Sequence, residues 1–259
     1  MHNKILEMKN NFKILGLALL LVVSCRAPLA VSNVQTQKNI QITEALPDNS
    51  VAKMIITPYK KSLEAKMNEK LSYTAVELTK QGDNSNLGNL LADYTLDGAR
   101  DWSVKNNFGQ NIDAAVINIG GIRTNIGKGD ILLKNIFEVM PFENELVVVK
   151  LTGEQMQGLF DYYLKTQKNN PVSGLVIETE NNALTKMLVN GKPIENKDYY
   201  IATSDYLALG GDNMNFFEKG EMISTGKKLR DLYIDIVKTK KEVVPPSDIR
   251  LIFKDKAVK

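Results

Sequence analysis

Apolar residues in this chain recur at helical spacing in some segments and at strand spacing in others, and the two kinds follow each other in no regular order. Helical spacing predicts helices over residues 51–70, 86–102, 152–164 and 226–239, and Thr152 offers an N-cap for the third. Short apolar or alternating runs predict strands over 72–79, 114–118, 144–151, 172–179, 184–189, 199–203 and 249–254. Because strands and helices do not alternate as in a series of βαβ units, we expect an α+β fold with helices packed on a mixed β-sheet.

The N-terminal part of the chain has the pattern of a signal peptide. Lys9 and Lys13 lead into a mostly aliphatic run over residues 14–23, which is shorter than the roughly 20 apolar residues that a membrane-spanning helix needs. The run ends in Val-Val-Ser-Cys at residues 22–25, which resembles a lipobox. We therefore expect a lipoprotein signal peptide at residues 1–24, starting at Met1 or Met8, with lipidation at Cys25. A plain secretory signal is the alternative.

Residues 25–50 are rich in Gln, Asn, Thr and Pro and show no sustained periodicity, so they read as a tether between the lipid and a folded domain at residues 51–259. The hydrophobic content of 43% is enough for one core of ordinary size. We expect a bacterial lipoprotein that is anchored to a membrane and lies in the periplasm or at the cell surface.

One histidine and one cysteine limit the chemistry of the chain. His2 lies in the expected signal peptide, so relays and metal sites that need histidine are not expected in the mature protein. Composition alone leaves a carboxylate-only site open, although no cluster in the sequence indicates one. The 33 basic and 30 acidic residues are dispersed, which argues against a nucleic-acid partner. We expect no catalytic residue, metal ligand or cofactor in this chain.

The first of three candidate ligand loops covers residues 118–123, Asn-Ile-Gly-Gly-Ile-Arg, directly after a predicted strand. Gly120 and Gly121 permit a close approach of the backbone to a ligand, and Arg123 supplies a forked cation suited to phosphate. Asn118 stands at the end of the strand. A pair of glycines in this position is also common in a simple turn.

The second and third loops each carry an aromatic residue. Phe142 and Asn144 lie at the start of a predicted strand, where a phenylalanine often belongs to the core. Tyr206 and Asp212 follow another predicted strand and flank a Gly-Gly turn. Two rings that can stack on a base, with a carboxylate that can accept hydrogen bonds from ribose hydroxyls, are what a nucleoside site requires.

These loops occur in the same order and spacing in the C-terminal domain of the 5′-nucleotidase family, which the chain resembles over residues 71–254. The family's Asn-Gly-Gly-Gly-Ile-Arg is similar to residues 118–123, and its Pro-Phe-Gly-Asn, valine-rich strand and Leu-Thr-Gly are similar to 141–153. Its Phe-Leu-Ala-x-Gly-Gly-Asp is similar to 206–212, and its Asn-x-Gly-Asn-Leu helix start is similar to 86–93. The resemblance implies the α+β fold of that domain and a role in nucleotide catabolism.

The resemblance also implies a role for each matching residue. Phe142 and Tyr206 would stack on the two faces of a nucleobase, and Asp212 would hold the ribose. Asn118 would touch the edge of the base, and Arg123 would reach toward the phosphate or the ribose. The complete set of expected substrate-binding residues is Asn118, Gly120, Gly121, Arg123, Phe142, Asn144, Tyr206 and Asp212.

The sequence departs from the family pattern at several places. Ile119 replaces the middle of three glycines, and Tyr206 replaces a phenylalanine, which adds a hydroxyl that needs a partner. Lys80 stands in the stretch where the family often has an arginine, and the stretch 167–172 is short.

Complete members of the family place a metallophosphoesterase domain, with two metal ions and a catalytic histidine, ahead of this domain. Here the preceding residues offer only His2, so the resemblance implies that divalent metals belong to a separately encoded metallophosphoesterase partner. The alternatives are a non-catalytic lipoprotein that binds a nucleotide or nucleoside, and a vestigial fragment. Retention of both aromatic residues, Arg123 and Asp212 argues against the fragment.

Overall fold

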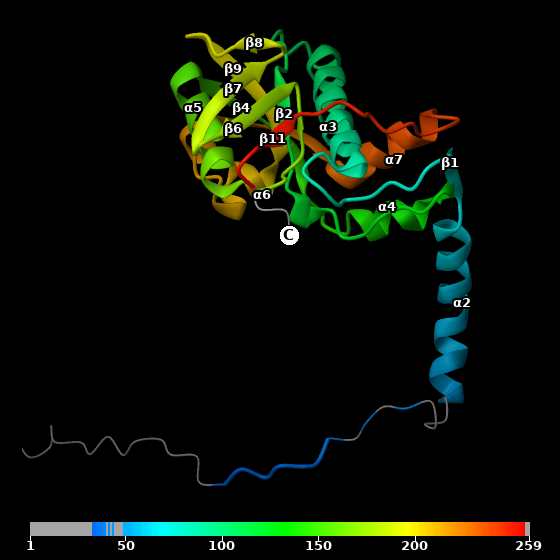
Figure 1. Cartoon of the computed structure of the whole chain (residues 1–259). Coiled ribbons are helices and arrows are strands. Elements are labelled where there is room, and N and C mark those ends of the chain that lie inside the picture. The colour runs from blue at the N-terminus through cyan, green and yellow to red at the C-terminus, as the bar shows by residue number, and fades with distance from the viewer. Residues whose placement is uncertain (1–32, 40, 42, 44–48, 257–259) are drawn as a thin grey trace, which may run out of the picture. The chain divides into compact units, whose positions relative to one another are not determined.

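The computed structural model describes residues 33–39, 41, 43 and 49–256 of the chain (Figure 1). The expected signal peptide, the lipidation site at Cys25 and much of the expected tether lie outside the described residues. The chain divides into two units, Met1–Ser50 and Val51–Lys259. The described helices and strands lie in the second unit, except that the first residue of the first helix, Ser50, is the last residue of the first unit.

A five-stranded sheet with the order β10-β4-β9-β2-β5 forms the middle of the domain (Figure 1). Its long central strands, β4 (Glu145–Thr152) and β9 (Asp198–Ser204), are antiparallel, and β2 (Ala114–Val116) runs parallel to β9. The edge strands β10 (Glu221–Lys228) and β5 (Val172–Ser173) pair antiparallel with β4 and β2. The mixture of strand directions agrees with the expected mixed sheet.

Both faces of this sheet are buried. Successive side chains of a strand point to opposite faces, so neighbouring residues of one strand reach different clusters. In β4, Leu146 and Val148 pack into one apolar cluster, whereas Val147, Val149 and Leu151 pack into the other. A strand that is covered on both sides needs a continuous apolar run, and the sequence Leu-Val-Val-Val supplies it. The domain therefore has two core clusters with the sheet between them.

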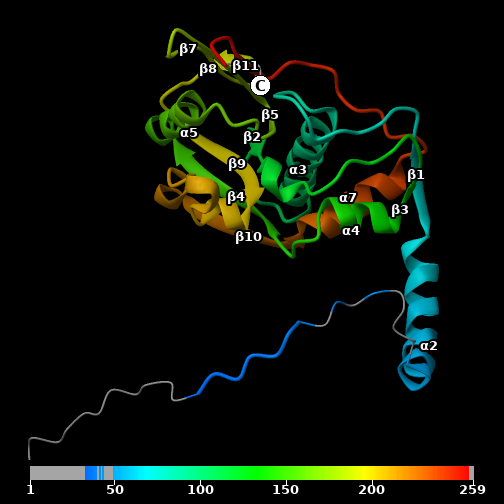
Figure 2. The ribbon, with the colours of Figure 1, turned by 60° about the horizontal axis from the view of Figure 1, so that its bottom comes forward.

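Helices α3 (Asn86–Lys105), α4 (Leu133–Val139) and α7 (Leu229–Thr239) cover one face (Figure 2). Ser85 caps α3, since its side chain accepts a hydrogen bond from the backbone N–H of Gly88. Close packing of α3 on α7 depends on Gly98, because a Cβ there would lie 2.4 Å from a methyl carbon of Leu232. A larger residue at position 98 would push the two helices apart.

Helix α5 (Gly153–Thr166) and a four-stranded sheet cover the other face. This second sheet has the order β11 (Leu251–Phe253), β6 (Leu175–Glu180), β7 (Ala183–Val189) and β8 (Lys192–Pro193). Thr152 and Gln155 form a capping box at the start of α5, so the N-cap that the sequence predicts at Thr152 is confirmed.

Buried Arg250 ties the C-terminal segment to α3. Its guanidinium donates to both carboxylate oxygens of Asp93, at 2.7 and 2.9 Å, and also pairs with Asp248. A forked contact of this kind fixes orientation as well as distance. Asp93 lies in the stretch 86–93 that matches the family's helix start, so this residue supports the packing of α3.

The remaining strands of the described region, β1 (Lys70–Thr74) and β3 (Gly129–Leu132), form a two-stranded sheet. Four short helices lie in the loops of the domain. These are η1 (Ile119–Gly121), α6 (Asp205–Ala208), η2 (Gly211–Asn213) and η3 (Phe217–Lys219).

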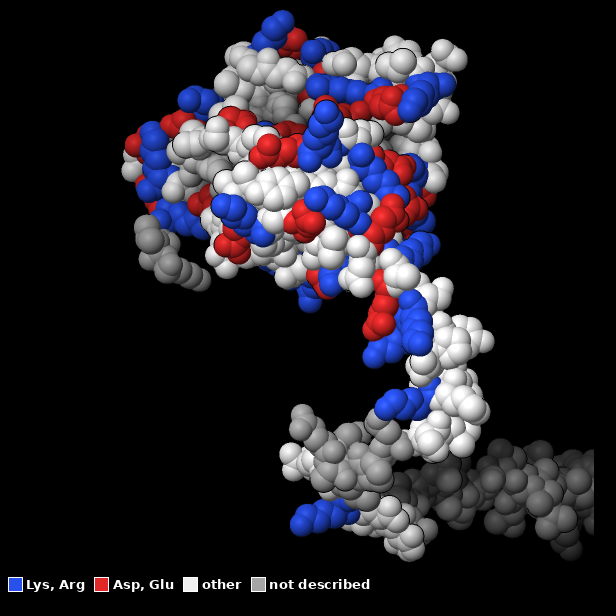
Figure 3. Space-filling view, turned by 90° about the vertical axis from the view of Figure 1, so that its right-hand side faces the viewer, with Lys and Arg blue, Asp and Glu red and all other residues white. Residues whose placement is uncertain are grey.

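Helix α2 (Ser50–Met67) buries none of its residues. Lysine side chains run along one side of it, and uncharged residues form the other side (Figure 3). The described part of the chain contains no helix that is both long and apolar enough to cross a membrane.

The α+β class is confirmed, and several of the expected boundaries are wrong. The strand expected over 172–179 is two strands in different sheets, β5 and β6, because the chain turns at Gly174, which has a φ of 73°. The helix expected over 51–70 ends at Met67.

The helix expected over 226–239 begins at Leu229, because the preceding residues end β10, whose Lys227 and Lys228 pair with β4. The strand expected over 72–79 ends at Thr74, whose hydroxyl bonds to the carbonyl oxygen of Val76 and forms a turn.

Candidate functional site

Three loops meet at one edge of the five-stranded sheet because of the directions of its strands. β2 and β9 are parallel, so the residues that follow them, including Asn118 and Tyr206, leave the sheet at the same edge. β4 is antiparallel to β9 and pairs Leu146 with Ser204, so the loop that precedes β4, with Phe142 and Asn144, reaches this edge as well.

The loops enclose a cavity of about 310 Å³, a volume at the lower end of the range for small-molecule pockets. Its lining consists of Asn118, Gly120, Phe142, Asn144, Tyr206 and Asp212. Phe142 and Tyr206 are 43% and 44% exposed, so neither residue belongs to the buried core. Six of the eight residues that the sequence singles out therefore line one cavity.

The remaining two expected residues are close to this cavity but do not line it. Gly121 is buried beneath the side chain of Asn118, and a Cβ at position 121 would lie 2.9 Å from the Asn118 Oδ1 atom. Its lack of a side chain thus lets Asn118 fold over the loop. Arg123 is exposed, donates to the carbonyl oxygen of Gly120 at 3.3 Å, and places its guanidinium 6.0 Å from the centre of the Phe142 ring.

Ile119 and Lys80, which differ from the family pattern near this loop, both have local hydrogen-bond partners. Ile119 directs its backbone N–H to the Oδ1 atom of Asn170, at 3.0 Å. The ammonium group of Lys80 donates to the carbonyl oxygen of Ile122, so this cation is bonded to the backbone of the first loop.

Arg230 of α7 holds the loop that carries Phe142. Its Nη1 atom lies 3.4, 2.9 and 3.5 Å from the carbonyl oxygens of Met140, Pro141 and Phe142, and its Nη2 atom pairs with the carboxylate of Glu143. The side chain is buried. Sequence reasoning did not identify Arg230, because the helical spacing of α7 indicates only its apolar residues.

The hydroxyl that Tyr206 adds to the family pattern is bonded to Asp212. It donates to the Asp212 Oδ1 atom at 3.3 Å and accepts from the backbone N–H of the same residue at 3.2 Å. Gly211 lies against the ring, since a Cβ there would be 2.6 Å from a ring carbon of Tyr206. Asp212 itself adopts a left-handed φ of 55°, which is strained for a residue with a side chain.

A family model described as 5′-nucleotidase, C-terminal domain, matches residues 65–219. The chain belongs to the 5′-nucleotidase C-terminal domain family. This assignment confirms the resemblance that the ordered motifs indicate, and the match includes all three loops of the cavity.

Similar proteins place this 5′-nucleotidase C-terminal domain within longer chains. It is 34% identical over 215 residues to the trifunctional nucleotide phosphoesterase protein YfkN of Bacillus subtilis, covering 71% of this chain and 14% of that protein. It is 26% identical over 188 residues to protein UshA of Escherichia coli, covering 68% of this chain and 32% of UshA. The chain therefore spans a third or less of the length of these relatives.

The solved 5′-nucleotidase precursor of Thermus thermophilus has the same fold. It superposes with a TM-score of 0.66 at 26% identity, and the match covers 83% of this chain and 45% of the Thermus chain. The described domain of the 5′-nucleotidase family thus corresponds to less than half of that structure.

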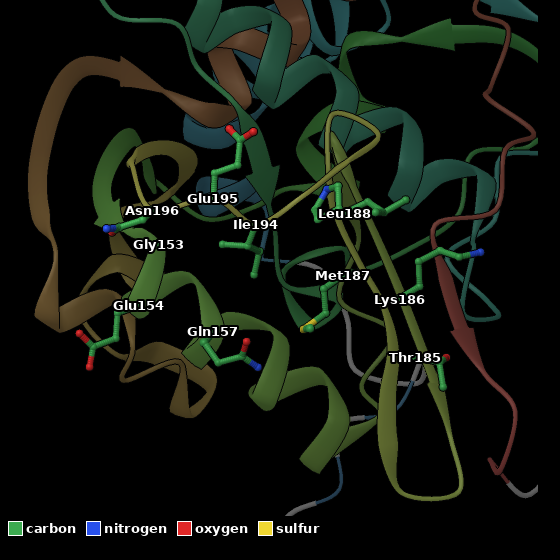
Figure 4. Close-up of a pocket in the computed structure, with 11 residues that line it drawn as sticks. Gly153, Glu154, Gln157, Thr185, Lys186, Met187, Leu188, Ile194, Glu195 and Asn196 are labelled. Atoms are coloured by element: carbon green, nitrogen blue, oxygen red, sulfur yellow. The ribbon is translucent and has the colours of Figure 1, made fainter.

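A larger hollow of about 570 Å³ lies between α5 and β7 (Figure 4), and it shares no lining residue with the smaller cavity. Met187 and Ile194 provide apolar lining, and Glu154 and Gln157 project from α5. Two of its charged residues already have partners, since Lys186 pairs with Glu178 and Glu195 lies 3.6 Å from Lys197. This hollow lacks the aromatic rings of the smaller cavity, so we take the smaller cavity as the candidate site.

Among residues 33–39, 41, 43 and 49–256, no group of three or more His, Cys, Asp or Glu side chains is placed to hold a metal ion. The cavity itself presents two aromatic rings, two amides and one carboxylate, with the guanidinium of Arg123 nearby.

Proposed function

We propose that this chain is the nucleotide-recognising part of a 5′-nucleotidase-type phosphohydrolase and acts in nucleotide catabolism. The observation that carries the proposal is the cavity, because three loops far apart in the sequence bring two exposed aromatic rings and one carboxylate to a space of about 310 Å³. Family membership and the names of the relatives, which include nucleotide phosphoesterases and 5′-nucleotidases, give independent support.

In this proposal each side chain of the cavity meets one part of a nucleotide. Phe142 and Tyr206 stack on the base, where stacking tolerates any base because each has a π-face. Asp212 accepts hydrogen bonds from ribose hydroxyls, and one of its oxygens already receives the Tyr206 hydroxyl. Asn118 and Asn144 offer amide groups to the base edge.

Arg123 contributes charge at the side of the cavity. Its guanidinium lies over Phe142 and is exposed, so a phosphate attached to a stacked nucleoside would meet it in a solvated setting. Charge pairs in such settings contribute little free energy on their own. We therefore expect the affinity of this chain for a nucleotide to be weak in the absence of further contacts.

We further propose that a separately encoded metallophosphoesterase supplies those contacts, together with divalent metals and the hydrolytic chemistry. Helix α2 supports this idea, because its residues Val51, Met54, Ile55, Ile56, Tyr59 and Leu63 are all large, apolar and exposed. Contiguous exposed apolar surface commonly marks a protein contact surface. The partner would cover this helix and complete the phosphate end of the site.

The proposed location is a bacterial membrane, through a lipid on Cys25, on the periplasmic or cell-surface side. The relatives that support the family assignment are bacterial proteins. In this arrangement the lipid holds the domain at the membrane, and the residues between Cys25 and α2 act as the tether.

The test of the proposed function is reconstitution with a metallophosphoesterase encoded beside this chain. We expect the chain alone to release no phosphate from nucleotides with any divalent metal, and we expect the mixture to co-purify and to gain activity. Arg123→Ala and Asp212→Ala should each lower the activity of the mixture and leave the circular dichroism of this chain unchanged. A partner that is fully active alone and indifferent to this chain would favour a non-catalytic nucleotide-binding lipoprotein instead.

A further inference from the structure

One buried amide connects the first loop of the cavity to α5. Asn170 is fully buried and follows α5 in the short stretch 167–172. Its Oδ1 atom accepts from the backbone N–H of Ile119, next to Asn118, at 3.0 Å. Its Nδ2 atom donates to the hydroxyl oxygen of Tyr162 at 3.0 Å. The amide therefore has one partner in the first loop and one on α5.

Tyr162 extends this connection to the third loop. Its hydroxyl donates to the backbone carbonyl oxygen of Asp212 at 3.3 Å. Burial, followed by the nearby charge of Asp212, raises the pKa of the Tyr162 hydroxyl above its ordinary value, which already lies well above neutral pH. A chain of three hydrogen bonds thus runs from Ile119 through Asn170 and Tyr162 to Asp212.

The end of this chain of bonds lies at a strained residue. Asp212 has a φ of 55°, a left-handed conformation that persists only where its surroundings hold it. Tyr162 holds the carbonyl oxygen of Asp212, and Tyr206 holds its N–H and one carboxylate oxygen. Removal of the Tyr162 hydroxyl would free the carbonyl side of this residue and leave the ring of Tyr206 in place.

We propose that Asn170 and Tyr162 are positioning residues that set the Asp212 carboxylate relative to Asn118 and thereby determine recognition of the ribose. This inference rests on the proposed function of the cavity as a nucleoside site. Neither residue lines the cavity. Tyr162 bonds to the backbone of Asp212, which does line it. Asn170 bonds to the backbone of Ile119, which lies between the lining residues Asn118 and Gly120.

The series of hydrogen bonds reaches the cavity at Asp212, which meets the ribose in the proposed site, and at the backbone beside Asn118. Loss of the Tyr162 hydroxyl removes the bond to the Asp212 carbonyl oxygen and leaves both bonds between Tyr206 and Asp212, so its effect falls on the ribose.

The experiment compares two ligands that differ only in the ribose hydroxyls. The full chain is titrated with adenosine and with 2′,3′-dideoxyadenosine by NMR, which measures weak affinities, for the wild type and for Tyr162→Phe and Asn170→Ala. Tyr233→Phe is the matched control, because its buried hydroxyl bonds to Thr95 on the other side of the sheet. Thermal melts of all variants report the general loss of stability.

The wild type should bind adenosine more tightly than the dideoxy ligand. Tyr162→Phe should weaken adenosine binding by about 2- to 12-fold, the factor that corresponds to one net hydrogen bond, and should leave dideoxyadenosine binding unchanged. Asn170→Ala should also reduce the ratio of the affinity for adenosine to the affinity for dideoxyadenosine. Tyr233→Phe should keep the wild-type value of this ratio even where its melting temperature falls.

Two results would overturn the inference and leave the proposed function standing. In the first, Tyr162→Phe keeps the wild-type preference for adenosine. In the second, Tyr162→Phe loses affinity for both ligands equally, as a general loss of rigidity in the domain would cause. A wild-type chain that binds neither ligand would instead remove the proposed nucleoside site, and this inference with it.

Discussion

Arg230 donates a hydrogen bond to the carbonyl oxygen of Pro141 across 2.9 Å. This contact joins α7 to the loop of Phe142, and neighbouring carbonyl oxygens share the same guanidinium nitrogen. Because a buried acceptor that loses its donor costs about 1–3 kcal/mol, Arg230→Ala should lower the free energy of unfolding by that order.

The same variant should weaken nucleoside binding, because the loop that carries Phe142 would lose its support. Arg100→Ala is the matched control, since Arg100 also donates to a backbone carbonyl oxygen, that of Ile112, and has no contact with the loop. Urea denaturation and NMR titration measure the two effects. Equal nucleoside affinity in Arg230→Ala and the wild type would show that Arg230 supports only the fold.

The sequence indicates the convergence of the three loops because each expected residue lies beside a recognisable apolar strand. The directions of β2, β4 and β9 then bring Asn118, Phe142 and Tyr206 to one edge. The supporting residues leave no comparable signal. Arg230 contacts Pro141 across 89 positions, and Tyr162 contacts Asp212 across 50, so only tertiary packing brings these pairs together.

Strand β10 shows a second limit of sequence reasoning. Residues 221–228 (Glu-Met-Ile-Ser-Thr-Gly-Lys-Lys) have few apolar side chains, and Gly226 lies at a positive φ near the irregular register between Ser224 and Lys227. An edge strand with a bulge can be this polar because one side of its backbone faces no neighbour. Its place in the sheet is therefore decided by pairing with β4.

Removal of Arg250 should destabilise the domain strongly. Its side chain is 8% exposed and forms a forked pair with Asp93, so Arg250→Ala would leave a partly buried carboxylate without its cation. We expect a loss of about 3 kcal/mol in the free energy of unfolding, measured with urea. Lys105→Ala, which breaks the exposed pair with Asp101, should cost at most about 1 kcal/mol. Similar losses for the two variants would contradict the structural role of Arg250.

The domain should lose stability at acid pH partly through Glu178 of β6, which pairs with Lys186 of β7 and with Lys254, directly after β11. Hydrogen bonds from Lys254 and Lys186 lower the pKa of this carboxyl from 4.5 to about 2. A lowered pKa in the folded state means that the ionised carboxylate stabilises the fold above pH 4.5 and that this contribution disappears as the pH falls toward about 2.

Thermal melts of Glu178→Gln and the wild type check this expectation. The variant should melt at a lower temperature at pH 7, and the difference should shrink between pH 4.5 and about 2. Glu180→Gln is the matched control, because Glu180 is more exposed and pairs with Lys254 alone. A difference between Glu178→Gln and the wild type that does not change with pH would contradict the assignment.

Cys25→Ala should release the protein from the membrane fraction or block its maturation, because the lipid anchor needs the thiol of this residue. Fractionation of cells that express the variant and the wild type measures the effect. Ser24→Ala keeps a small residue before the cysteine and should leave the protein in the membrane fraction. Unchanged fractionation of Cys25→Ala would count against lipidation.

The most direct measurement of the central claim is an NMR titration of the full chain with a nucleoside. We predict that the resonances that shift belong to residues around the cavity, among them Asn118, Phe142, Tyr206 and Asp212. Phe142→Ala and Tyr206→Ala should each weaken binding by about 1–3 kcal/mol, the range for a base stacked on an aromatic ring. Tyr59→Ala, which removes an exposed ring on α2, should bind as the wild type does. Shifts that map elsewhere, or equal affinity in the wild type and both cavity variants, would contradict the account.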